Sequence, residues 1–162
     1  LLALSEEAFE KVGALLDAVK LRNAITEVMS LAHEANRYLN EKEPWKQIKT
    51  DPAAAATTMY VCLQVIDRLK VLFLPFLPFS SQKLHAFLGY DGDVMGRQFV
   101  EKYKETEREH LALRYDGSAL AVRWEPTTLA PGQRLRKPAP LFTKLDEHVA
   151  EEETARMLAR LG

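Results

Sequence analysis

The stretch Ala35-Asn36-Arg37-Tyr38-Leu39-Asn40-Glu41-Lys42-Glu43-Pro44-Trp45-Lys46 decides the fold of this chain. A residue that precedes a proline is driven out of the α region, so Pro44 predicts that a helix ends or kinks here. Trp45 then stands at a helix end beside a loop, where its indole could face a flat partner. A tryptophan among cations suits single-stranded nucleic acid, whose bases stack on aromatic rings. The alternative is that Trp45 packs against the next helix, as most aromatic side chains do.

Amphipathic helical patterns flank this stretch on both sides. Apolar residues recur at helical spacing over residues 21–39, which predicts one long helix with a single buried stripe. Ser5, followed by two glutamates, predicts the start of an earlier helix. Asp51-Pro52 predicts the start of a later helix that runs to about residue 74. Residues 80–89 predict a fourth, and the short connections favour an antiparallel bundle.

The pattern changes after residue 96. Residues 98–109 are charged and predict a weakly amphipathic helix. Two strand-like runs, 110–115 and 118–124, flank Asp116-Gly117, a dipeptide typical of hairpin turns. A proline-rich segment follows, and residues 146–161 predict a last helix with acidic residues first and basic residues last.

These patterns predict a mainly α fold. We expect an antiparallel helix bundle over residues 1–96 and a helix plus a β-hairpin inserted over residues 97–126. An extended tail and a C-terminal helix, packed on the same domain, are expected over residues 127–162. Trp124 is expected to be a packing residue of the hairpin.

The composition limits the possible partners. Twenty-two basic and 23 acidic residues give 162 residues a formal charge of −1. This balance argues against a broad basic coat and against DNA as a partner, so an RNA contact would be a local patch. The single cysteine, Cys62, excludes an internal disulfide and fits a reducing, cytoplasmic setting. Charged residues and prolines interrupt the apolar segment 59–79, so we expect no membrane span.

No pattern in the sequence predicts catalysis or metal binding. No glycine-rich phosphate loop occurs, and no carboxylates pair on an apolar background. The histidines lie far apart without a second ligand at metal-binding spacing. They are expected to be lone surface side chains: His33, His85, His110 and His148. The chain is therefore expected to hold no catalytic residue and no metal ligand.

Three motifs follow one another between residues 20 and 145. Asn36, Tyr38 and Pro44-Trp45, with Lys49 after them, fit a motif A-N-x-Y … P-W-x-x-x-K. Residues 74–80 fit a P-x-L-P turn between two helices, and residues 131–142 fit a closing P-G … K-P-x-P-L-F motif. Together they resemble the C-terminal helical domain of methionyl-tRNA synthetases.

The resemblance implies a function in RNA binding. In that family the bundle holds the CAU anticodon of tRNA(Met), while a separate catalytic domain joins methionine to the tRNA with ATP. The catalytic H-I-G-H-like and K-M-S-K-S-like motifs are absent here, so ATP and zinc would belong to the catalytic part of a longer parent protein. The implied partners are tRNA(Met) and that catalytic domain. The implied anticodon-binding residues are Trp45, Pro44, Asn40, Asn36 and Arg37, and the implied phosphate contacts are Lys42, Lys46 and Lys49.

Two departures and two alternatives stay open. Asn40 stands where many members carry Asp, which places its base contact in doubt. The family also carries an Asn-x-x-x-Arg pair on a preceding helix, and the first twenty residues here contain neither Asn nor Arg. Asn36 and Tyr38 could equally be helix-packing residues. The near-neutral charge also allows a structural or protein-interaction module without RNA binding.

Overall fold

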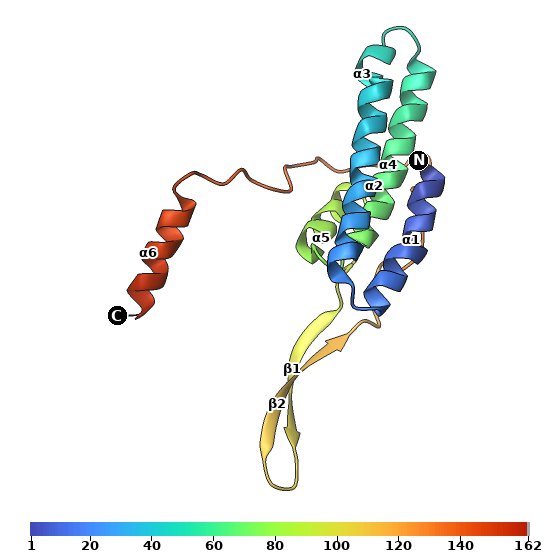
Figure 1. Cartoon of the computed structure of the whole chain (residues 1–162). Coiled ribbons are helices and arrows are strands. Elements are labelled where there is room, and N and C mark those ends of the chain that lie inside the picture. The colour runs from blue at the N-terminus through green and yellow to red at the C-terminus, as the bar shows by residue number, and fades with distance from the viewer. Residues whose placement is uncertain (162) are drawn as a thin grey trace.

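A bundle of four helices forms the body of the molecule (Figure 1). The computed structural model describes residues 1–161. Its bundle helices are α1 (Leu2–Asp17), α2 (Leu21–Lys42), α4 (Pro52–Leu72) and α5 (Pro78–Phe87). A short helix α3 (Pro44–Gln47) joins α2 to α4 at one end of the bundle (Figure 1). The predicted mainly α bundle is confirmed.

The core of the bundle lies where α1, α2 and α4 meet. Each of these helices turns apolar residues into the core. The stripe predicted over residues 21–39 is only partly buried, because Val28 lies in the core whereas Leu21 and Met29 are 54% and 43% exposed. Val94 and Val122, which flank the hairpin in the chain, close one end of the core. The remaining core residues are Phe9, Val12, Ala24, Val28, Leu31, Val65, Leu69, Val71 and Leu72.

The start of α4 agrees with the sequence prediction, whereas the start of α1 does not. Asp51 caps α4 as predicted, because its Oδ1 accepts a hydrogen bond from the Ala54 amide at 2.9 Å. Ser5 does not cap α1, which begins three residues earlier, at Leu2. Instead the buried Ser5 hydroxyl accepts a hydrogen bond from Arg68 of α4 at 2.7 Å. Ser5 is therefore a polar contact between two helices.

A long β-hairpin projects from the bundle at the end opposite α3 (Figure 1). Its antiparallel strands are β1 (Arg97–Lys104) and β2 (Glu109–Asp116). The helix expected over residues 98–109 is wrong, because this segment forms β1 and the turn of the hairpin. The turn predicted at Asp116-Gly117 is wrong as well: the Asp116 carboxylate accepts from the Ser118 amide at 2.9 Å and ends β2.

Trp124 lies beyond the hairpin and packs on α1. Its indole N–H donates to the carbonyl oxygen of Phe9 at 3.0 Å, and the two rings meet edge to face. Farther along, the Gln64 side chain pairs with both the amide and the carbonyl of Leu129. These contacts hold the extended segment against the bundle. Trp124 is a packing residue as expected, although it is not part of the hairpin.

The last helix, α6 (Val149–Leu161), stands apart from the bundle (Figure 1). Residues 150–160 are exposed, including Met157 and Leu158. The structure differs from the expectation that this helix packs on the same domain, since the tail carries it away from α1–α5. Gly162, the last residue of the predicted tail, lies outside the described residues.

A buried polar cluster lies between α4 and α5. Asp67 and Lys70 form an ion pair, and the Lys70 ammonium lies 3.9 Å from the centre of the Tyr90 ring. The His85 ring stacks on the Tyr90 ring, with 4.9 Å between the two ring centres. The expectation that every histidine is exposed is wrong for His85, which is 2% exposed. Burial lowers the pKa of Lys70, and burial together with Asp67 raises the pKa of Tyr90 to about 12.

Residues 1–161 hold neither a candidate membrane-spanning helix nor a candidate cluster of metal ligands. None of the helices in this part combines the length and the apolarity that crossing a membrane requires. Over the same residues, no three or more histidine, cysteine or acidic side chains gather in a way that could hold a metal ion.

Candidate nucleic-acid interface

The chain reverses direction at Glu43. This residue adopts the left-handed conformation, with φ 43° and ψ 58°, and its amide still bonds to the Leu39 carbonyl of α2 at 3.0 Å. Pro44 then opens α3, where a missing N–H costs nothing. The helix break that the Glu43-Pro44 step predicts is confirmed. The reversal fixes Trp45 at the tip of the bundle.

The Trp45 indole lies half in solvent. Its side chain is 52% exposed, while Pro44 beside it is buried. The ring borders a shallow cavity of about 460 Å³ between α3 and α4. The lining is almost entirely apolar: Leu39, Pro44, Trp45, Ile48, Pro52, Ala55, Ala56 and Met59. This geometry offers an aromatic face and an apolar recess to a flat ligand, and it departs from the alternative in which Trp45 is buried between helices.

A side-chain hydrogen bond holds α3 on α4. The Thr58 hydroxyl donates to Gln47 Oε1 at 3.2 Å, and Thr58 is buried. The backbone adds a second link, because the Asp51 amide bonds to the Gln47 carbonyl at 2.7 Å. Trp45 therefore stands on a four-residue helix that is fastened at its far end.

Polar side chains lie on the last turns of α2, before the chain reverses. Asn36 and Asn40 are one helical turn apart, share a face of α2 and are both exposed. Neither makes a side-chain hydrogen bond within the described residues, so their amides are available to a ligand. Arg37 is exposed on the neighbouring face and forms ion pairs with Glu34 and Glu41. Tyr38 is half-buried, which fits the helix-packing role that the sequence left open.

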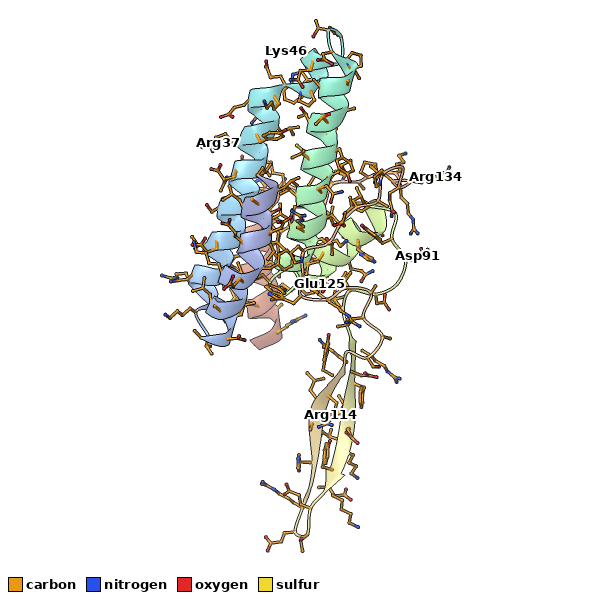
Figure 2. All side chains as sticks on the ribbon, turned by 90° about the vertical axis from the view of Figure 1, so that its right-hand side faces the viewer. Arg37, Lys46, Asp91, Arg114, Glu125 and Arg134 are labelled. Atoms are coloured by element: carbon orange, nitrogen blue, oxygen red, sulfur yellow. The ribbon has the colours of Figure 1, made fainter. Side chains whose placement is uncertain are left out.

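The three predicted phosphate contacts differ in their partners. Lys46 lies at the tip of the bundle (Figure 2) and pairs with Glu43 at 2.6 Å. Lys42 lies 5.9 Å from the centre of the Tyr38 ring. Lys42 and Lys49 form no ion pair with any residue in the described part of the chain, and both are exposed. Arg37 and Lys46 are therefore neutralised by neighbouring carboxylates. Lys42 and Lys49 face solvent without an acidic partner among the described residues.

The sequence did not identify the apolar side of this site. Ile48 and Met59 are 60% and 44% exposed. Both line the recess beside Trp45. An isoleucine in a loop of charged residues was the one available signal. Met59 carried none, since its spacing fits the core.

Comparison with protein families matches this chain to one model. Residues 1–113 match the family described as "Anticodon binding domain of methionyl tRNA ligase". The match covers the whole bundle and most of the hairpin.

Curated relatives align along nearly the full chain. The methionine–tRNA ligase of Roseiflexus sp. (strain RS-1) is 48% identical over 162 residues, which are 99% of this chain and 27% of that protein. That of Chloroflexus aggregans is 52% identical over 154 residues, which are 94% of this chain and 26% of that protein. The chain thus spans about a quarter of the length of these relatives.

The fold is shared with a solved structure of a methionyl-tRNA synthetase. The crystal structure of the apo form of Mycobacterium tuberculosis methionyl-tRNA synthetase matches with a TM-score of 0.65 over 90% of this chain and 25% of that chain. The two sequences are 23% identical over this match, so the likeness bears on the fold.

Proposed function

Since this chain belongs to the family of anticodon-binding domains of methionyl-tRNA ligases, we propose that it holds the CAU anticodon of tRNA(Met). It does so as part of a longer methionyl-tRNA synthetase, which joins methionine to that tRNA with ATP in the cytoplasm. The single observation that carries this proposal is the half-exposed Trp45 indole above an apolar recess at the tip of the bundle.

Trp45 supplies the stacking surface. The bases of an anticodon loop are unstacked, and proteins recognise such bases by aromatic stacking and by hydrogen bonds to their edges. Stacking on an aromatic side chain contributes about 1–3 kcal/mol per base. Pro44 is buried beneath the indole, so its role is to set the ring in place. Ile48 and Met59 cover the rim of the same recess.

The end of α2 supplies the polar contacts. Asn36 and Asn40 each present an amide, which can donate to and accept from a base edge. Lys42 and Lys49 attract phosphates, because no described acidic residue pairs with them. Arg37 and Lys46 contribute less charge, since Glu34 and Glu43 hold them in ion pairs. The resulting electrostatic attraction is modest.

The remainder of the synthetase supplies the chemistry. We assign ATP to the catalytic part, because the H-I-G-H-like and K-M-S-K-S-like motifs do not occur in this sequence. We assign any zinc ion there as well, since the described residues offer no cluster of metal ligands. The catalytic part is the second partner of this domain, beside tRNA(Met). A purely structural module without RNA binding is not favoured, because it gives no reason for Trp45 to be half exposed in the same segment as Lys42 and Lys49, which have no described acidic partner.

A titration of the full-length synthetase tests the proposal. The ligands are tRNA(Met) with its CAU anticodon and the same tRNA with a substituted anticodon, each at two salt concentrations. We expect tighter binding of the CAU form at both concentrations, because base contacts specify while phosphate contacts only attract. Both affinities should fall as salt rises.

The titration separates base recognition from charge attraction. Equal affinity for the two tRNAs at both salt concentrations would contradict the proposal. The result would then leave nonspecific phosphate binding as the only RNA contact of this domain.

A further inference from the structure

One face of the β-hairpin is apolar and exposed. In the observed register Val100 faces Leu113, Lys102 faces Leu111 and Gln98 faces Tyr115, so these residues share one face. We define the hairpin apolar face as Val100, Leu111, Leu113 and Tyr115. Their side chains are 62%, 70%, 71% and 60% exposed, in that order. The opposite face carries Glu101 and Arg114, which form an ion pair at 3.3 Å.

The hairpin apolar face continues into a groove at the root of the hairpin. Tyr115 and Gln98 line this groove together with the turn between α4 and α5. Its volume is about 450 Å³, and Phe79 on its rim is 74% exposed. A convex apolar strip therefore runs into a concave apolar recess, which is the shape of a protein interface rather than of a solvated surface.

Charge and position separate this surface from the RNA site. Residues 97–116 contain five basic and five acidic side chains, so the hairpin has no net field to attract phosphates. The charged residues of this face lie toward the turn of the hairpin, where Lys102 pairs with Glu109. Arg114 of the hairpin and Lys46 of the RNA site lie at opposite ends of the molecule (Figure 2). An anticodon loop bound at Trp45 cannot cover the hairpin.

A two-stranded hairpin is marginal in water without a partner for its apolar face. Relatives that align with 94–99% of this chain carry the matched segment as about a quarter of their length. In these relatives most of the protein lies outside the segment and could cover the hairpin. We propose that the hairpin apolar face and its root groove dock against the catalytic part of the same synthetase chain. This proposal rests on the proposed function, because it takes the chain as one domain of that longer protein.

Photo-crosslinking in the full-length synthetase tests the docking. The photoreactive amino acid p-benzoylphenylalanine replaces Leu113 in one variant and Arg114 in a matched control, whose side chain projects from the opposite face. We expect the probe at Leu113 to give a several-fold higher yield of crosslinks to residues of the same chain outside this domain, mapped by mass spectrometry. Equal yields from the two faces would overturn the proposal, as would crosslinks from Leu113 only to tRNA or only to a second copy.

Charged substitutions give an independent readout. Leu113→Glu is expected to speed amide hydrogen exchange across residues 109–116 in the full-length protein, whereas Arg114→Lys, which keeps a cation beside Glu101, is expected to leave it near wild type. The same exchange rate in both variants would overturn the docking. Trp45→Ala should keep the crosslink from position 113. A failure of anticodon recognition is therefore seen in the tRNA titration alone, and a failure of docking is seen in the crosslinking alone.

Discussion

The Thr58 hydroxyl donates a hydrogen bond to the side-chain oxygen of Gln47 at 3.2 Å, and this bond joins the short helix α3 to the long helix α4. Trp45 lies two residues before Gln47 on the same short helix. A four-residue helix has little stability of its own. The orientation of the indole therefore depends on a contact made by residues that do not touch the recess.

We predict that Thr58→Val weakens tRNA binding although Thr58 reaches no ligand. Valine keeps the shape but removes the donor, and a hydrogen bond of this kind contributes about 0.5–1.5 kcal/mol. The affinity of the synthetase for tRNA(Met) should fall by about 2- to 10-fold. Thr57→Val is the matched control, because the exposed Thr57 hydroxyl bonds only to the Ala53 carbonyl of its own helix. Equal losses in the two variants would remove the positioning role.

We predict that Trp45→Ala acts on tRNA binding and spares methionine activation. Loss of one stacked base costs about 1–3 kcal/mol. That corresponds to an affinity for tRNA(Met) lower by about 5- to 150-fold. Pyrophosphate exchange with methionine and ATP alone should stay near wild type. Trp124→Phe is the control, since Trp124 packs on Phe9 far from the recess. A parallel loss in both assays would argue against Trp45 as an RNA contact.

We predict that the lysines of the site differ in their contribution to salt dependence. Lys49→Ala should reduce the slope of log affinity against log salt by about 1, as expected for one lost phosphate contact. Lys46→Ala should reduce it less, because Lys46 already pairs with Glu43. Binding of tRNA(Met) measured over a series of salt concentrations gives both slopes. A larger change for Lys46→Ala than for Lys49→Ala would reverse this assignment.

We predict that the domain loses stability as the pH falls through the range of histidine titration. The pKa of His85 lies below its ordinary 6.5, because burial disfavours the charged ring and Lys70 repels it. These effects outweigh the Asp91 carbonyl and the carboxylates of Asp67 and Asp91, which act in the opposite direction. Below about pH 6.5 the unfolded chain binds a proton that the folded chain resists, so the free energy of unfolding decreases.

Denaturant unfolding at several pH values between 7.5 and 5.5 measures this effect. The contribution of His85 approaches at most about 1.4 kcal/mol per pH unit, the value for one proton. His85→Gln should flatten the pH dependence, whereas His33→Gln, which removes an exposed histidine, should keep it. An unchanged slope in His85→Gln would show that other groups set the acid sensitivity.

The sequence predicts the helices because their signals are local. Asp51-Pro52 starts α4 through a cap and a fixed φ, and the Glu43-Pro44 step ends α2 through a steric clash. The exposed indole of Trp45 follows from that step together with the family motif. Residues adjacent in the chain determine these features, so a pattern of a few residues is enough to predict them.

The errors concern features that distant residues decide. Residues 97–104 are rich in Glu, Lys and Arg, which favour helix, yet pairing with 109–116 makes them a strand. Asp116-Gly117 can end a strand as well as turn a hairpin. His85 is buried because α5 packs it beside Lys70 and Tyr90, and the bond between Thr58 and Gln47 joins two helices. No local pattern carries such information.

The left-handed residue Glu43 has a consequence for how this domain varies in length. Because the reversal is attached directly to the end of α2, one residue inserted in that helix would turn the indole by about 100° around the helix axis. The wall of the recess that α4 supplies would stay where it is, and the indole would no longer face it. Homologous chains should therefore gain and lose residues at the tip of the hairpin, while the spacing from the core of α2 to Trp45 stays constant.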